Sequence, residues 1–181
     1  KPFYDSVKAR AQGIDNAAAK QKIIVTLYEN FFKKGFEKTT DAMGIVFTPV
    51  EVVDFIIHSV DYALQKYFGK HLSDQNVHIL DPFTGTGTFI TRTLQYFREQ
   101  MDAGKITYQD ILRKYMHELH ANEIVLLSYY IAAINIEAVF DEVNGPDRGY
   151  KPFDGIVLTD TFESTERQNS FMDELLGQNN E

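Results

Sequence analysis

The chain of 181 residues has no cysteine, which excludes disulfide bonds and thiolate metal sites and suits a reducing, cytoplasmic environment. It also lacks any apolar run close to the roughly 18 residues of a membrane-spanning helix, so no membrane partner is expected. The chain starts at Lys1 instead of a methionine, and no signal-peptide pattern follows. We therefore expect it to be a piece of a longer cytoplasmic polypeptide.

The chain also has no excess of basic over acidic residues. The formal net charge is −8, whereas a surface that holds a nucleic-acid backbone usually carries more lysine and arginine than acid. If the parent protein binds a nucleic acid, we expect most of the contacts to come from regions outside this chain. The five histidines show no spacing typical of metal ligands, so no metal site is predicted.

The sequence does contain enough apolar residues, 44%, for one domain with a hydrophobic core. From Asn16 onward, apolar residues recur three and four positions apart and predict an amphipathic helix that ends at Lys33-Lys34-Gly35. A second helix is predicted to start at Thr48-Pro49-Val50-Glu51, where the threonine and the glutamate have the spacing of a capping box, and to end at Gly69.

Strands and helices alternate through the rest of the chain. A short apolar run predicts a buried strand at 77–80, a weaker signal indicates a strand at 119–122, and a third strand is predicted at 155–160. Helices are predicted at 88–101 and 124–139, with a short helix from Thr107, which stands three residues before Asp110. Because strands separated by helices pair in parallel, the prediction is a partial Rossmann-like α/β fold of about three parallel strands flanked by helices. A helical extension (1–43) precedes this core (44–165), and a polar tail (166–181) follows it.

The most informative segment follows the first predicted strand and opens the next helix: Asp81-Pro82-Phe83-Thr84-Gly85-Thr86-Gly87-Thr88-Phe89. Its two glycines allow a tight turn and a close approach of the backbone to a ligand. The helix start behind them offers unpaired N–H groups, which suit a carboxylate or a phosphate.

Three kinds of ligand can be weighed for this loop. A dinucleotide fingerprint needs a third glycine where Ile90 stands, and a Walker A loop needs a lysine that does not follow Gly87. The third kind, S-adenosylmethionine, is bound by loops with an acid at the strand end, two glycines and an aromatic residue inside the helix. Asp81 and Phe89 complete that pattern, and Asp81 can orient the ammonium group of the ligand.

The segment from Asp81 to Phe89 resembles motif I of N6-adenine DNA methyltransferases. The segment Gly44-Ile45-Val46-Phe47-Thr48-Pro49 resembles their motif X, which precedes motif I in the gamma-ordered enzymes, as it does here. The wider pattern, over about residues 20–165, is similar to the methyltransferase domain of single-chain Type I-like (Type ISP) restriction-modification enzymes. The resemblance implies an S-adenosylmethionine-dependent methyltransferase fold whose parent protein acts on DNA.

The resemblance also implies a role for particular residues. Glu123 matches the motif II acid that accepts the ribose hydroxyls of the cofactor, and Ile124 beside it would pack on the adenine. Asp160 matches the motif III acid that accepts the adenine amino group, with Thr161 in the same pocket. At the methionine end, the residues expected to close over the cofactor are Phe47, Thr48 and Pro49. The remaining contacts would come from the loop residues Asp81, Pro82, Phe83, Thr84, Gly85, Gly87 and Phe89.

One family motif is not found in the sequence. N6-adenine methylation needs an Asn/Asp-Pro-Pro-Tyr/Phe loop after the fourth strand, and none of the 181 residues forms it. No catalytic residue is therefore predicted, and this chain is expected to be inactive by itself. Without that strand, the 77–80 strand is expected to expose an edge, which self-association or a covering segment would hide. A methyltransferase that acts on RNA or protein, or a non-catalytic S-adenosylmethionine-binding module, remains as an alternative.

Overall fold

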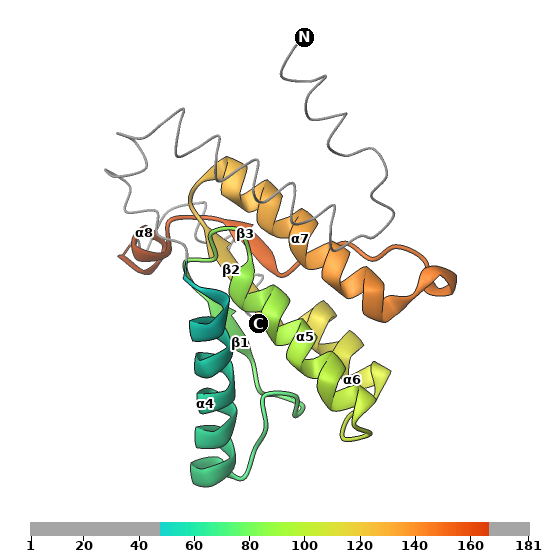
Figure 1. Ribbon diagram of the computed structural model, residues 1–181. Coiled ribbons are helices and arrows are strands. Elements are labelled where there is room, and N and C mark those ends of the chain that lie inside the picture. Colours follow the sequence, from blue (N-terminus) through green and yellow to red (C-terminus); the bar gives the residue numbers. More distant parts are fainter. Residues whose placement is uncertain (1–47, 167–181) are drawn as a thin grey trace.

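The computed structural model describes residues 48–166, so the predicted helix from Asn16 and the segment 44–47 lie outside the described residues. Helices and strands alternate along this part of the chain (Figure 1). In order, the elements are α4 (Val50–Phe68), β1 (Ile79–Asp81), α5 (Thr88–Asp102), α6 (Tyr108–Arg113), η1 (Lys114–Glu118), β2 (Leu119–Glu123), α7 (Leu126–Asn144), η2 (Pro146–Arg148), β3 (Ile156–Leu158) and α8 (Thr161–Glu166).

The three strands form one parallel sheet in the order β1-β2-β3, which confirms the predicted fold class. Asp81 is in register with Ala121, and Glu123 is in register with Leu158, so the three strands end on the same side of the sheet. Ligands of open α/β sheets bind beyond such carboxyl ends. The topology therefore brings the loops after β1, β2 and β3 to one place.

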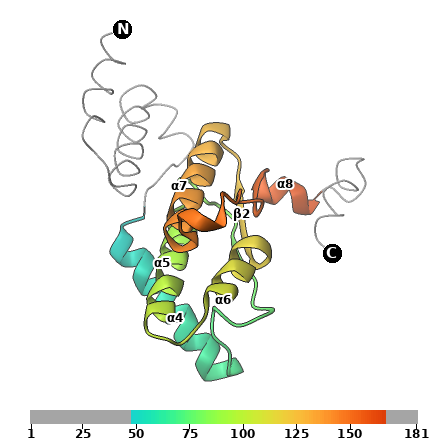
Figure 2. The ribbon, with the colours of Figure 1, turned by 90° about the vertical axis from the view of Figure 1, so that its right-hand side faces the viewer.

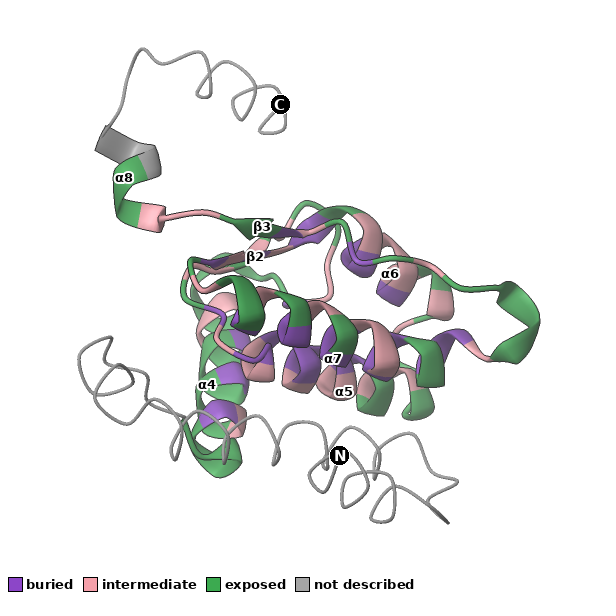
Figure 3. Cartoon of the chain, turned by 90° about the horizontal axis from the view of Figure 1, so that it is seen from above, coloured by how far each residue is buried: buried purple, intermediate pink, exposed green. Residues whose placement is uncertain are grey.

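The core lies between one face of the sheet and the helices α5 and α7, which lie side by side (Figures 2 and 3). α4 packs against α5 on the same side (Figure 3). Because the side chains of a strand alternate between faces, β2 points Leu119, Ala121 and Glu123 into this core. The helices and β3 contribute the fully or nearly fully buried side chains Ile90, Leu94, Phe97, Ala132, Ile136, Phe140 and Ile156. Each large side chain buried this completely stabilises the fold by about 1.5–3 kcal/mol.

The opposite face of the sheet is only partly covered by the described residues. Leu80 and Val157 are 56% and 39% exposed on it. On the same face, the rings of His78 and His120 stack, and a hydrogen bond of 2.9 Å joins Nδ1 of His78 and Nε2 of His120. The expectation of a buried first strand is therefore wrong: β1 is half-exposed and lies at the end of the sheet. It also starts two residues later than predicted, at Ile79.

A buried ion pair fixes the loop that leads into β1. Lys114 lies in the π-helical turn η1 and is completely buried. Its ammonium donates to the carbonyl oxygens of Asp74 and Val77 at 2.5 and 2.6 Å and pairs with Glu118 at 2.8 Å. Glu118 in turn accepts the backbone N–H of Asn76 at 2.8 Å. The π-helical turn before β2 thus holds the start of β1 in place.

The helix ends correct one prediction and confirm another. The predicted capping box at Thr48 and Glu51 does not form, since the residue before the first turn of α4 is Pro49. The carbonyl oxygen of Pro49 instead accepts the N–H groups of Val52 and Val53 in the first turn of the helix. A capping box does form at the start of α6, where Thr107 and Asp110 exchange both hydrogen bonds. Among the described residues, no helix combines the length and apolarity that crossing a membrane requires.

Candidate functional site

The loop between β1 and α5 is a tight turn that depends on its two glycines. Gly85 and Gly87 have φ angles of +58° and +86°, a region that side chains with a Cβ rarely adopt. At Gly87 a Cβ would also lie 3.3 Å from the Cα and the carbonyl oxygen of Ala132 on α7. The second glycine therefore allows both the turn and the close packing of the loop on α7.

Glu123, at the end of β2, binds this loop through its carboxylate. Glu123 is 8% exposed, and its carboxylate accepts two backbone N–H groups. Gly85 donates to Oε2 and Val125 donates to Oε1, each at 2.7 Å. Since a carboxylate oxygen has two lone pairs, each oxygen keeps one for another donor. The pair of neighbouring acceptors suits a ligand that carries two adjacent hydroxyl groups.

Asp81, at the end of β1, is an acid that burial keeps poorly solvated. Its Oδ1 accepts the N–H of Phe83 at 3.3 Å, whereas Oδ2 is buried with no hydrogen-bond partner. Burial raises the pKa of Asp81 to about 6, and the negative charge of Glu123 adds to the rise, while the Phe83 hydrogen bond opposes it. A cationic group next to Oδ2 would satisfy this oxygen and stabilise the charged form.

The loop after β3 is joined to the loop after β1. The hydroxyl of Thr161 donates to the carbonyl oxygen of Pro82 at 2.7 Å and accepts from the Asn122 amide at 3.3 Å. Asp160 uses Oδ1 to accept the N–H groups of Phe162 and Glu163 at the start of α8. Thr161 thus links the carboxyl ends of all three strands, because Asn122 belongs to β2.

Three apolar side chains stand exposed around these polar groups. The rings of Phe83 and Phe162 contact each other with centroids 5.4 Å apart, although they come from the loops after β1 and β3. Each ring is more than half exposed, as is Ile124 immediately after Glu123. Exposed apolar surfaces next to a carboxylate suit a flat ring with a polar edge, such as a nucleobase.

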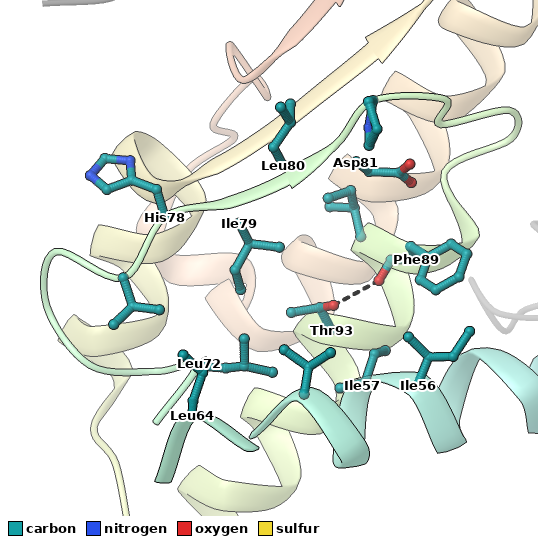
Figure 4. A pocket seen from close by; sticks show the side chains of 14 residues that line it. Ile56, Ile57, Leu64, Leu72, His78, Ile79, Leu80, Asp81, Phe89 and Thr93 are labelled. Atoms are coloured by element: carbon teal, nitrogen blue, oxygen red, sulfur yellow. Dashed lines mark hydrogen bonds between the residues drawn. The ribbon is translucent and has the colours of Figure 1, made fainter. Parts of the chain in front are cut away.

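A pocket of about 540 Å³ lies between β1 and the helices α4 and α5 and reaches Asp81 (Figure 4). Phe89 and Thr93 of α5 line one wall, and Ile57 and Leu64 of α4 line another (Figure 4). Its lining is almost entirely apolar, in contrast to the loop above it. The pocket and the glycine loop share Asp81 and Pro82, so the two spaces are neighbours.

The structure brings together most of the site residues predicted from the sequence. Hydrogen bonds, including those from the Thr84 hydroxyl to the Asp81 carbonyl and from the Gly87 N–H to the Thr84 carbonyl, connect one region that contains Asp81, Pro82, Thr84, Gly85, Gly87, Glu123 and Thr161. Thr48 and Pro49 are exposed residues just before α4, and Phe47 lies outside the described residues. Phe89 is half-buried and faces the apolar pocket. Whether these residues contact a ligand remains a prediction.

Sequence reasoning missed two asparagines that support the site. Asn122 contacts Thr161, and Asn135 of α7 donates from Nδ2 to the carbonyl oxygen of Thr86 at 2.9 Å. A signal existed for Asn135, because an amide in the middle of an apolar helix must find a hydrogen-bond partner when it is buried. In the described part of the chain, no cluster of three or more histidine, aspartate or glutamate side chains could hold a metal ion.

Comparisons with known proteins bear on this region directly. The family model described as N-6 DNA Methylase matches residues 19–175. No curated protein sequence matches the chain. Among solved structures, the chain is similar to the Type ISP restriction-modification enzyme LlaGI, a nuclease-deletion mutant in complex with a DNA substrate mimic, with 66% identity and a TM-score of 0.83. It is also similar to the ATP-dependent Type ISP enzyme LlaBIII bound to DNA, with 67% identity and a TM-score of 0.84.

A third similar structure is the DrdV–DNA complex, with 40% identity and a TM-score of 0.79. The similarity covers 99%, 99% and 92% of this chain but only 14%, 12% and 15% of the three larger proteins, in the order given. These matches confirm the family resemblance predicted from the sequence. They also show that the chain spans a small part of the length of these proteins.

Proposed function

Because the chain belongs to the N-6 DNA methylase family, we propose that residues 44–165 are the S-adenosylmethionine-binding part of a DNA adenine-N6 methyltransferase within a cytoplasmic restriction-modification enzyme. The observation that carries the proposal is the glycine turn between β1 and α5, which meets Glu123, Asp81 and Thr161 at one end of the sheet. The family match favours DNA over RNA or protein as the substrate of the parent enzyme.

The residues present fit the chemical groups of S-adenosylmethionine. The spare lone pairs of Glu123 suit the two ribose hydroxyls, and the unpartnered Oδ2 of Asp81 suits the ammonium of the methionine part. Asp160 and the exposed side chains of Ile124 and Phe162 lie where an adenine would find a polar and an apolar contact. When bound, the cofactor supplies an electrophilic methyl group, and the task of this chain is to hold and orient it.

We expect this chain alone to bind the cofactor without transferring a methyl group, since it has no Asn/Asp-Pro-Pro-Tyr loop. DNA would be held by other regions of the parent enzyme, in line with the net charge of −8. The three similar structures are DNA complexes, which supports DNA as the partner.

We also propose that the edge of β1 favours self-association of the isolated chain. β1 is the terminal strand of the sheet, and Leu80 is more than half exposed there. Gel filtration with light scattering at several concentrations tests this idea. A chain that remains monomeric at high concentration would contradict it.

Calorimetric titration of the chain with S-adenosylmethionine tests the proposed function. The unmodified chain should bind, and Glu123→Gln should weaken binding roughly 10- to 100-fold, since hydrogen bonds to a charged group contribute about 1.5–3 kcal/mol. Glu142→Gln is the matched control, because Glu142 is an exposed acid of α7 whose carboxylate pairs with Arg98. An unmodified chain that folds but shows no binding, or equal effects of the two variants, would overturn the proposal.

A further inference from the structure

Asn135 is a polar residue in an otherwise apolar part of α7. It lies between Ile134 and Ile136 and is 2% exposed. A buried amide without partners costs free energy that the apolar neighbours do not offset. Its Nδ2 donates to the carbonyl oxygen of Thr86, which lies 49 residues earlier in the chain. The side chain therefore connects the middle of α7 to the glycine loop.

The bonded carbonyl belongs to the peptide unit that joins Thr86 to Gly87, within the glycine turn. That unit has one acceptor, the oxygen of Thr86, and one donor, the N–H of Gly87. Asn135 bonds the acceptor at 2.9 Å, and the oxygen of Thr84 accepts the donor at 2.9 Å. With a hydrogen bond on each side, this peptide plane cannot rotate freely.

Two further contacts hold the loop against rotation. Glu123 accepts the N–H of Gly85, and Gly87 packs so closely on α7 that a Cβ would lie only 3.3 Å from the Ala132 backbone. Ala132 and Asn135 are three residues apart on α7, so they face the loop together. One face of α7 thus supports the loop at both the Thr86 carbonyl and Gly87.

We propose that Asn135 is a positioning residue for the cofactor: it holds the 85–88 turn in its ligand-binding shape before any ligand arrives. This inference rests on the proposed function, because it names the loop as the cofactor-binding element. Without the Asn135 amide, the Thr86 carbonyl loses its hydrogen bond, and Gly85 and Gly87 allow the turn to leave this conformation more readily. The ligand would then have to order the loop when it binds, and its affinity would fall.

The same helix supplies a matched control. Asn144 is also almost completely buried, at 1% exposed, and its Nδ2 also donates to a backbone carbonyl, that of Gly149, at 2.7 Å. It further accepts the hydroxyl of Tyr108 at 2.8 Å. Because Asn144 lies at the opposite end of α7 from the site, its removal costs comparable hydrogen bonds without touching the glycine loop.

The test compares Asn135→Leu and Asn144→Leu in the full 181-residue chain. Affinity for S-adenosylmethionine is measured by calorimetry at a temperature well below the melting temperature of each variant. Asn135→Leu should raise the dissociation constant about five- to tenfold, as expected for one lost hydrogen bond, whereas Asn144→Leu should change it less than about twofold. Equal changes in the two variants, or an unchanged constant in Asn135→Leu, would overturn the proposal.

Amide hydrogen exchange of the ligand-free variants gives a second readout. Peptides that cover 82–88 should exchange faster in Asn135→Leu, while exchange there in Asn144→Leu should match the unmodified chain. Should Asn135→Leu fail to fold, Asn135→Ser is measured in the same way, with Asn144→Ser as its control. An unmodified chain that does not bind the cofactor would remove the proposed function and this inference together, whereas binding with unchanged loop exchange would remove only the inference.

Discussion

Replacing Asp81 with asparagine should stabilise the ligand-free chain while it weakens cofactor binding. The pKa of Asp81 is raised from 3.8 to about 6, mainly by burial. Because each tenfold change in an ionisation constant corresponds to about 1.4 kcal/mol, the charged form carries a penalty of roughly 3 kcal/mol. Asp81 is only half-buried, and the new amide would need its own partner, so a gain of about 1–2 kcal/mol is expected at neutral pH.

The gain should depend on pH in a defined direction. An acid whose pKa is higher in the folded state than in the unfolded state destabilises the fold when it is charged in both. The penalty of Asp81 is therefore complete above pH 6 and is relieved as the pH falls from about 6 toward 4. Consequently, Asp81→Asn should be more stable than the unmodified chain at pH 7.5, and the difference should shrink toward zero near pH 4.

Urea unfolding of both proteins at pH 7.5 and pH 4.5 measures these differences, and calorimetry at pH 7.5 measures the cofactor affinity. Asp160→Asn is the control, since Asp160 accepts two backbone N–H groups at the start of α8 and its substitution should not stabilise the chain. The explanation by burial is wrong if Asp81→Asn is less stable than the unmodified chain at pH 7.5. It is also wrong if the difference in unfolding free energy between the two proteins is the same at both pH values. Unchanged cofactor affinity in Asp81→Asn would remove the ammonium contact.

Three further substitutions test other parts of the structure. Lys114→Met removes the nearer of the two cations that pair with buried Glu118 and leaves only Arg113, at 3.6 Å, so thermal melting should show a loss of about 3–5 kcal/mol, and an unchanged melting temperature would contradict this. Thr161→Val removes the hydrogen bond to Pro82, and calorimetry should show cofactor affinity reduced about two- to tenfold; equal affinity would mean that the link is unimportant. Gly155→Ala would place a Cβ 2.2 Å from the Leu119 carbonyl oxygen, so circular dichroism should show a largely unfolded chain, in contrast to a native spectrum if the backbone can shift.

The elements with strong local signals were predictable from the sequence. α5 begins at Thr88 as predicted, because the glycine turn before it and the apolar spacing after it agree. The weak strand at 119–122 is real and extends one residue further, to Glu123. α4 ends at Gly69 in the left-handed conformation that only glycine adopts without strain. In these cases, neighbouring residues determine the structure.

Features that depend on contacts between distant residues were not predictable. The pairing of His78 with His120 requires the register of β1 and β2. In the candidate site, the residue types at Asp81 and Glu123 were predictable, but Asn122 and Asn135 donate to Thr161 and Thr86 across gaps of about 40–50 residues.

The position of β1 at the end of the sheet has a consequence for the energetics of the site. β1 contributes three residues and pairs only with β2 within the described residues, yet the glycine loop starts directly from it. Any segment that pairs with the free side of β1 would restrict the same strand that presents Asp81. By thermodynamic reciprocity, occupancy of that side and occupancy of the proposed cofactor site would change each other's affinity by the same factor. A sheet edge and a small-molecule pocket would then behave as one coupled binding system.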